Sequence, residues 1–410
     1  MRCDATVCLA VLLSLVAGGV RAPAAPSSGY MSESRRCFDC DGRHFVGLTQ
    51  SKKLVVWDAL TGRAIRTLDG FQDPIYLAML LPDGRSVLGQ SFKLGTDSTT
   101  WGTTEKGRPD RSMRLWNIDS GKVAWRIPDS LFDAFSADGR RVYGVTIKAP
   151  RLERPKLVCW DLRTGAPAFT MPNFVPNGFL SNIAEESADG QRLLYSDQSG
   201  VTVFDLKSRE KLANIRSTHE FGAPPAALLG NGDTFFYDSS PGEQGVIALY
   251  SLSQNGIVDK ATFPSERLTL VGGQTFLDPW RPFAIGWLPR SEGFVSFCTG
   301  GHWMSYIKGR GLVDRGKGGT SGPHDIIVSP DEQSFVACYS TRQGEKETFK
   351  IEAYDAETCK KRWERPGMGI KFLPNGQLVV LDGDAVVFVD MASGAAKRTI
   401  RLEGFLSKND

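Results

Sequence analysis

Histidine is scarce in this sequence, with only 4 among 410 residues. So few imidazoles leave little material for zinc sites or for general-base catalysis. The spacings Gly-x-Ser-x-Gly and His-Glu-x-x-His are absent, and with them the usual signatures of serine hydrolases and zinc proteases. His44, His219, His302 and His324 share no metal-ligand spacing. We therefore expect no catalytic residue, no metal site and no cofactor, which favours a protein that is not an enzyme.

The sequence also lacks an excess of charge of one sign and any long hydrophobic run. Lys and Arg total 49 against 46 Asp and Glu, a net charge of +3, which excludes a protein built mainly to bind nucleic acid. Hydrophobic residues make up 41% and charged residues 23%, close to a soluble globular average. The apolar run Val7–Val20 is too short to cross a bilayer comfortably as a helix. A polytopic membrane protein and a disordered chain are thereby excluded.

The N-terminus is typical of an export signal. Arg2 precedes the apolar run, and Ala22-Pro23-Ala24 places small residues where a signal peptidase cleaves. We predict a signal peptide over 1–24, a short linker over 25–33, a single folded domain over 34–405 and a tail over 406–410. The alternative is an uncleaved anchor or a buried helix. The expected location is secreted, periplasmic or in the cell envelope, with no transmembrane segment after cleavage.

Six cysteines follow the predicted signal peptide, and an even number in an exported chain permits disulfides. Three of them lie in apolar, strand-like runs, which favours buried free thiols that act as small hydrophobes. Cys37 and Cys40 have redox-motif spacing, but they precede a turn rather than open a helix, so the helix terminus that lowers a thiol pKa is missing. Whether any disulfide forms stays open. The six are Cys37, Cys40, Cys159, Cys298, Cys338 and Cys359.

A turn sequence recurs along the chain, each time after a short apolar run. Most copies contain Asp-Gly or Asn-Gly, which supply the positive φ that a reversal between strands needs. The copies predict a series of tight β-hairpins. They are Cys40-Asp41-Gly42-Arg43, Leu81-Pro82-Asp83-Gly84-Arg85, Ser136-Ala137-Asp138-Gly139-Arg140, Ser187-Ala188-Asp189-Gly190-Gln191, Ser329-Pro330-Asp331-Glu332 and Leu373-Pro374-Asn375-Gly376.

A second sequence follows each hairpin: an aromatic residue, an Asp or Asn, then Thr-Gly or Ser-Gly. The clear copies are Trp57-Asp58, Trp116-Asn117 and Trp160-Asp161, and the weaker ones are Phe204-Asp205, Tyr354-Asp355 and Val389-Asp390. The interval between 205 and 355 has room for two unmarked copies, near Leu249-Tyr250-Ser251 and Met304-Ser305-Tyr306. Four strands in each of eight units predict an all-β chain folded as an eight-bladed β-propeller. Seven blades and a set of β-sandwich domains are the alternatives.

The repeats resemble those of WD-repeat and quinoprotein-like propellers. Asn117-Ile118-Asp119-Ser120-Gly121-Lys122-Val123-Ala124-Trp125 is similar to the Asp-x-x-Thr-Gly-Lys-x-x-Trp pattern of pyrroloquinoline-quinone repeats, and Asp355 to Trp363 forms a second copy. The resemblance implies that Trp125 and Trp363 dock onto the next blade. The Gly-His dipeptide of WD repeats is missing from the expected phase of the repeat, and the adjacent cysteines of quinoprotein alcohol dehydrogenases are absent from the sequence.

The long connections in the repeat are expected on one face of the ring. In a blade with strands a, b, c and d, the b–c and d–a connections emerge together, opposite the a–b and c–d turns. Ser91–Asp110, Lys148–Lys156 and Ser340–Thr348 are polar b–c insertions, and Pro264–Pro282 is a long d–a stretch. Because long loops on a rigid scaffold usually carry function, we predict the binding surface on this face.

One of these loops is basic. Lys148, Arg151, Arg154 and Lys156 stand against the single acid Glu153, so we hypothesise contact with an acidic protein or an anionic polysaccharide, the alternative being a solvated loop. Lys308, Arg310, Arg315 and Lys317 form a second basic cluster among glycines, interpreted as a flexible loop and not as a phosphate-binding loop. Asp382-Gly383-Asp384 is interpreted as a hairpin turn rather than a calcium site, and Trp280, Trp287 and Trp303 as fillers between blades rather than a sugar platform.

Two functional hypotheses follow. The favoured one is a non-catalytic scaffold that binds a protein or a polysaccharide in the cell envelope. The alternative is a quinoprotein-like dehydrogenase or a propeller hydrolase with a site at the central channel. The sequence leaves the identity of the partner and the oligomeric state open.

Overall fold

The computed structural model contains strands and turns but no helix in the part of the chain that it describes. That part comprises residues 39–49, 53–70, 75–91, 112–146, 155–176, 183–216, 224–239, 245–269, 275–279, 282–298, 301–318, 322–343 and 346–405. Accordingly, none of these residues forms a helix long and apolar enough to span a membrane. The predicted signal peptide, linker and tail lie outside them.

Eight antiparallel sheets, each of four consecutive strands, form the blades. Blade 1 contains β1 (Asp39–Cys40), β2 (His44–Leu48), β3 (Leu54–Asp58) and β4 (Ala64–Leu68), and blade 2 contains β5 (Ile75–Leu80), β6 (Ser86–Ser91), β7 (Ser112–Asn117) and β8 (Val123–Pro128). Blade 3 contains β9 (Ser130–Phe135), β10 (Arg141–Thr146), β11 (Lys156–Asp161) and β12 (Pro167–Thr170). Blade 4 contains β13 (Ile183–Glu186), β14 (Arg192–Asp197), β15 (Gly200–Asp205) and β16 (Lys211–Arg216).

The second half of the chain repeats this order. Blade 5 contains β17 (Ala226–Leu228), β18 (Thr234–Asp238), β19 (Val246–Ser251) and β20 (Gly256–Thr262), and blade 6 contains β23 (Pro282–Leu288), β24 (Gly293–Cys298), β25 (His302–Ile307) and β26 (Gly311–Lys317). Blade 7 contains β27 (Asp325–Val328), β28 (Ser334–Gln343), β29 (Lys346–Asp355) and β30 (Lys361–Pro366). Blade 8 contains β31 (Met368–Phe372), β32 (Leu378–Asp382), β33 (Ala385–Val389) and β34 (Ala396–Arg401).

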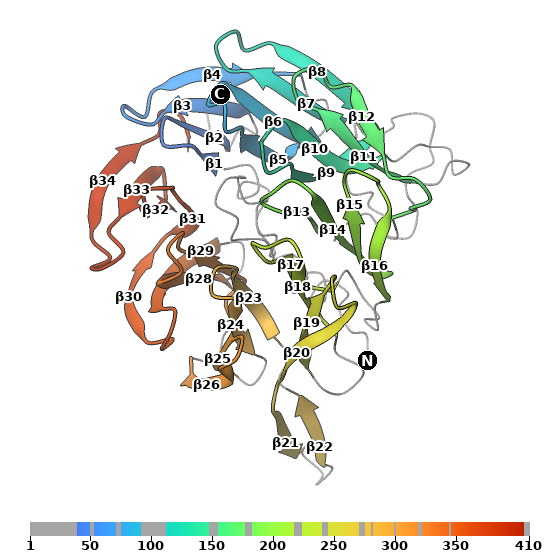
Figure 1. Cartoon of the computed structure of the whole chain (residues 1–410). Helices are drawn as coiled ribbons and strands as arrows, with labels where there is room; N and C mark the ends of the chain where they lie inside the picture. The colour runs from blue at the N-terminus through green and yellow to red at the C-terminus, as the bar shows by residue number, and fades with distance from the viewer. Residues whose placement is uncertain are drawn as a thin grey trace.

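The blades are arranged as a ring, with the first strand of each near the centre and the fourth at the outside (Figure 1). The core is divided into eight apolar clusters, one at each interface between neighbouring blades. The cluster that joins Phe45 and Trp57 of blade 1 to Phe388 and Ile400 of blade 8 closes the ring. The predicted eight-bladed propeller is confirmed, and the alternative of seven blades is wrong.

Apolar burial on both faces of each blade explains why the units assemble. The second and third strands are buried along nearly their whole length, whereas most residues of the fourth strands, such as β4 and β34, are exposed. A four-stranded sheet of this composition would leave both faces in water if it stood alone, and neighbouring blades cover them. The ring thus depends on contacts between units that are close in sequence, together with one contact between its ends.

Three sequence-based interpretations need correction or refinement. Ser340–Thr348 is not a loop insertion, because β28 and β29 continue to pair up to Gln343 and Lys346. Ser340, Thr341 and Thr348 are exposed, so the polar pattern reflects a solvated pair of strands and not a loop. The supposed flexible loop at Gly311–Lys317 is the outer strand β26, paired with β25. The stretch Pro264–Pro282 contains an additional hairpin, β21 (Ser265–Thr269) with β22 (Thr275–Pro279), which projects from the ring between blades 5 and 6 (Figure 1).

Candidate functional site

The topology places the b–c and d–a connections on one face, here called the loop face, and the a–b and c–d turns on the other, here called the turn face. The longest connection runs from Ser91 at the end of β6 to Ser112 at the start of β7. The turns of the turn face are short and are all described. Most connections of the loop face lie wholly or partly outside the described residues.

Three of the four cations in the predicted basic loop, Lys148, Arg151 and Arg154, lie outside the described residues. The fourth, Lys156, is the first residue of β11 and is exposed. Its backbone N–H donates to Oγ1 of Thr146, at the end of β10, over 3.3 Å. The structure therefore fixes the base of this loop at the loop face of blade 3.

The aspartates that follow the aromatic residues stabilise c–d turns. Oδ1 of Asp58 accepts hydrogen bonds from the backbone N–H of Leu60 and from the N–H and hydroxyl of Thr61, at 3.0, 2.7 and 2.8 Å. These bonds, those from Thr61 above all, lower the pKa of Asp58. Asp161 and Asp355 accept equivalent bonds from their own turns. These carboxylates are occupied by the backbone reversal and are not available for chemistry.

The docking role implied for two tryptophans is observed. Nε1 of Trp125, on β8, donates to the carbonyl of Leu162 in blade 3 over 2.7 Å. Nε1 of Trp363, on β30, donates to the carbonyl of Met391 in blade 8 over 2.8 Å. Each indole lies against a glycine of the next blade, where a Cβ would approach the ring to 2.7 Å. The glycines in question are Gly165 and Gly394.

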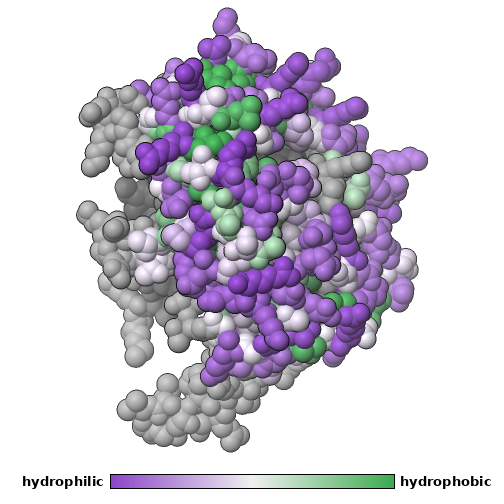
Figure 2. Space-filling view, turned by 90° about the vertical axis from the view of Figure 1, so that its left-hand side faces the viewer, coloured by the Kyte–Doolittle hydropathy of each residue, from purple (hydrophilic) through white to green (hydrophobic). Residues whose placement is uncertain are grey.

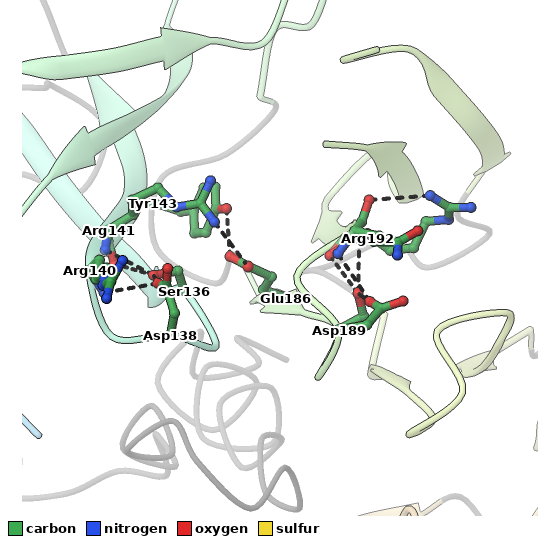
Figure 3. A network of polar contacts seen from close by, with 10 residues as sticks. Ser136, Asp138, Arg140, Arg141, Tyr143, Glu186, Asp189 and Arg192 are labelled. Atoms are coloured by element: carbon green, nitrogen blue, oxygen red, sulfur yellow. Dashed lines mark hydrogen bonds and ion pairs between the residues drawn. The ribbon is translucent and has the colours of Figure 1, made fainter. Parts of the chain in front are cut away.

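A polar network occupies the interface between blades 3 and 4 (Figure 3). Glu186, on β13, accepts a hydrogen bond from the hydroxyl of Tyr143 on β10 over 2.6 Å. Nη2 of Arg141 lies 3.4 Å from the same carboxylate, whose side chain is only 1% exposed. Burial raises the pKa of Glu186, while Tyr143 and Arg141 oppose that rise. The turn beside it is closed independently, by the Ser136 hydroxyl donating to Asp138 over 2.6 Å.

Two further carboxyl groups, on the inner strands β13 and β9, have raised pKa values. Oε2 of Glu185 accepts the backbone N–H of Leu228, on the inner strand of blade 5, over 2.8 Å. Burial raises the pKa of Glu185 to about 7. Burial likewise raises the pKa of Asp133, on β9, to about 8, although the hydroxyl of Tyr195 donates to it over 3.4 Å. Among the described Asp and Glu residues, Asp133 and Glu185 have the pKa values raised furthest, and perturbed acids are candidates for function.

Sequence reasoning missed these acids, although a signal was present. Glu185 and Glu186 are adjacent in a short run that leads into the Ser187-Ala188-Asp189-Gly190 turn. By the repeat pattern this run is the inner strand of a blade. Two consecutive acids there must point to opposite sides, toward two different neighbouring blades.

The other described residues singled out from the sequence lie in the apolar core, in a hairpin turn or in ion pairs. Trp287 and Trp303 are each 2% exposed, inside the apolar clusters that join blade 6 to its neighbours, and Trp280 lies outside the described residues. Asp382 and Gly383 belong to the hairpin between β32 and β33. Lys308 pairs with Glu292 at 2.6 Å and Arg310 with Glu357 at 3.6 Å. Within the described ranges, no three His, Cys, Asp or Glu side chains are arranged to hold a metal ion.

The described cysteines are buried. Cys159, Cys298 and Cys338 are no more than 2% exposed, in agreement with their interpretation as small core residues. Burial raises the pKa of the Cys40 thiol to about 12. A thiol that stays protonated at neutral pH is a poor nucleophile, so the geometry gives Cys40 no redox character. Its partner in the motif, Cys37, lies outside the described residues.

Seen from the side of β30 and β34, the outer wall of the ring is largely hydrophilic, with apolar side chains confined to small areas (Figure 2). This side of the wall is therefore a poor docking surface. The most exposed large apolar residue in the described ranges, Leu60 at 71%, stands on a c–d turn of blade 1. Scattered apolar residues of this kind are normal on protein surfaces.

Comparison with known proteins extends the description of the fold only. No protein-family model matches this chain, and no curated protein is similar to it. Among solved structures, a crystal structure of a eukaryotic initiation factor matches with a TM-score of 0.52 and 13% sequence identity. The match covers 89% of this chain and 96% of that chain. At this identity the similarity shows the fold alone.

Proposed function

We propose that this protein is an exported, non-catalytic scaffold that binds a protein or a polysaccharide through its loop face. One observation carries the proposal. Acids and tryptophans of the turn face and the blade interfaces are occupied by structural contacts, whereas the strands that the long connections join begin and end on the opposite face. Long connections on a rigid ring are where binding residues are usually carried. The signal-like N-terminus supports export to the envelope, periplasm or medium.

The basic loop of blade 3 is the part of this face with a defined chemistry. Lys148, Arg151, Arg154 and Lys156 carry four positive charges against Glu153. Such a loop complements an anionic polymer and increases the rate of encounter with it at low salt. The docking of Trp125 and Trp363 supports a relationship of the blades to quinoprotein-like repeats, a relationship of fold that brings no activity with it.

The test compares two charge-neutralised variants of the full mature chain. In the first, Lys148, Arg151, Arg154 and Lys156 are all replaced by Gln. In the matched control, the same number of cations on the turn face are replaced by Gln, namely Arg85, Arg140, Arg163 and Lys207, all exposed. The probes are a sulfated polysaccharide and poly-L-glutamate, titrated by calorimetry at low and physiological salt.

We expect the loop variant to lose about ten-fold in affinity for at least one probe, and the control to stay within about two-fold. The probe that responds distinguishes a polysaccharide from an acidic protein. Equal losses in both variants would show non-specific charge attraction and contradict the role of the loop. Wild-type protein that binds neither probe would also contradict it.

A further inference from the structure

The inner strand of blade 4 is held on both sides by its own carboxyl groups. Glu186 accepts the hydroxyl of Tyr143 from blade 3 at 2.6 Å, and Glu185 accepts the backbone N–H of Leu228 from blade 5 at 2.8 Å. The two residues are adjacent on β13, so their side chains point to opposite sides. Each therefore joins blade 4 to a different neighbour.

A third carboxyl group makes the contact with blade 3 reciprocal. Asp133 lies on β9 of blade 3, where the pairing with β10 is irregular. It accepts the hydroxyl of Tyr195 from β14 of blade 4 at 3.4 Å. A tyrosine of blade 3 thus donates to a carboxyl group of blade 4, and a tyrosine of blade 4 donates to a carboxyl group of blade 3.

These carboxyl groups have little positive charge around them. No described residue forms an ion pair with Asp133 or Glu185, and the charged group that acts on Asp133 is a second acid, Asp197 on β14. For Glu186 the cation is Arg141 of β10, at 3.4 Å, and Asp138 of the adjoining turn opposes it. Asp133 and Glu185 are half-buried. A carboxylate removed from water without a cation is costly, and the neutral acid is much less so.

Blade 1 provides a contrast in the same geometry. Oδ2 of Asp39 accepts the backbone N–H of Leu80, on the inner strand of blade 2, over 3.0 Å. This is the contact that Glu185 makes with blade 5. Asp39, however, has Lys371 at 2.5 Å. The two sites share the hydrogen bond to the next blade and differ in the cation and in the N–H of Cys40, which Asp39 also accepts at 2.7 Å.

We propose that blade 4 is a proton-controlled element, held firmly between blades 3 and 5 while Asp133 and Glu185 are protonated and loosened when they ionise. A neutral carboxyl group still accepts the contacts described above through its carbonyl oxygen. Ionisation would place negative charges in a desolvated site and next to Asp197. The device would operate whether or not the loop face binds a partner.

The direction of the pH effect follows from the pKa values. Burial raises the pKa of Asp133 to about 8 and that of Glu185 to about 7, above the value of about 4 expected in the unfolded chain. The folded state therefore keeps protons that the unfolded state has already lost. The stabilisation is complete below the unfolded-state pKa and is lost as pH rises through 7 and 8.

Hydrogen exchange of the full mature chain between pH 5.5 and pH 8.5 tests the proposal. After correction for intrinsic exchange, the opening constants of amides in β13 and β14 should rise by up to about a hundred-fold per pH unit below about pH 7, because both acids keep protons that the open state has lost. The rise should fall to about ten-fold per unit between about pH 7 and 8, and amides of β17, which contact Glu185 alone, should show a smaller rise. Amides of β2 and β6, in blades 1 and 2, should change much less. Equal pH dependence in all of these strands would overturn the proposal.

Substitution of the acids by neutral amides of the same shape tests which residues cause the pH dependence of blade 4. Asp133→Asn together with Glu185→Gln should remove most of the pH dependence in blade 4 and increase its protection at pH 8.5 by at least ten-fold. The matched control Asp39→Asn, which removes a carboxylate from the equivalent contact, should leave the pH dependence of blade 4 unchanged. A double variant that retains the wild-type pH dependence would refute the assignment, and so would a control that abolishes it.

Discussion

Glu332 adopts a backbone conformation that the corresponding turns give to glycine. Its φ is 59°, and Gly84, Gly139 and Gly190 occupy the equivalent position at 60°, 66° and 71°. The carboxylate of Glu332 accepts the N–H of Arg290, the N–H of Ser291 and the hydroxyl of Ser291, at 2.7, 3.0 and 2.8 Å. Blade 7 thereby stabilises the a–b turn of blade 6, which has no Asp of its own. A conformational cost at one residue is offset by contacts in the neighbouring blade.

The substitution Glu332→Gly should destabilise the protein, although it relieves the positive φ. Relief of the backbone contributes about 1 kcal/mol, and loss of three hydrogen bonds to a partly desolvated carboxylate costs about 2–4 kcal/mol. We expect a net loss of about 1–3 kcal/mol in urea unfolding. Glu332→Gln, which keeps one acceptor and the positive φ, should lose less than Glu332→Ala. A Glu332→Gly protein as stable as wild type would contradict this role.

Single residues show where sequence reasoning ends. The turn at Ser329-Pro330-Asp331-Glu332 was predictable, because its residues specify a local reversal. The partner of Glu332 lies in another blade and was not predictable from local pattern. The same limit explains why Asp133 was missed, since its environment consists of Tyr195 and Asp197 from the next blade.

The contacts between neighbouring blades follow the sequence repeat more closely than the contacts of single residues such as Glu332 do. The fourth strand of a blade docks on the c–d turn of the next blade, using Trp125 in blade 2 and Trp363 in blade 7. In blade 1 the position is held by Arg66, whose Nε donates to the carbonyl of Ile118 over 3.3 Å. The Ile118 carbonyl that binds the guanidinium occupies the same position in the repeat as the carbonyls of Leu162 and Met391. In blade 1 an arginine thus makes the contact that tryptophans make in blades 2 and 7.

The docking predicts an asymmetry between two glycines of blade 8. Gly394 has a φ of 71° and lies against Trp363, whereas Gly376 has a φ of 80° and open space within 4 Å of the point where a Cβ would stand. Gly394→Ala should therefore cost about 1–3 kcal/mol more than Gly376→Ala in thermal or urea unfolding. In a Trp363→Ala background the difference should disappear. If it persists there, the cost does not arise from the indole.

Most strands were predictable, and the exceptions have a common cause. Alternating apolar residues and Asp-Gly turns mark the blades wherever the repeat is strong. The repeat weakens between β19 and β26, where no local pattern indicates the hairpin β21–β22 and the glycines of Gly311–Lys317 favour a loop. Those glycines disfavour a strand by propensity, but pairing with β25 in a covered blade outweighs that cost.

The ring closes without an exchange of strands between its first and last blades. In the described structure, every blade consists of four consecutive strands. The last and first blades are held together by their apolar cluster, by Trp57 donating to the carbonyl of Glu403 over 2.8 Å, and by Lys371 beside Asp39. The ring brings both ends of the repeat array into contact. The assignment of a loop face and a turn face requires this closure, because separate blades would share no common face.

Zero-length carbodiimide crosslinking followed by peptide mass spectrometry tests the closure directly. Lys371 Nζ lies 2.5 Å from Asp39 Oδ1, so the reagent should join blade 8 to blade 1 through an amide bond. Lys308 with Glu292, at 2.6 Å, and Lys397 with Asp390, at 2.7 Å, serve as controls within single blades. A closed ring predicts the Lys371–Asp39 crosslink together with both controls in the monomer. Both control crosslinks without the Lys371–Asp39 crosslink would contradict the closed ring.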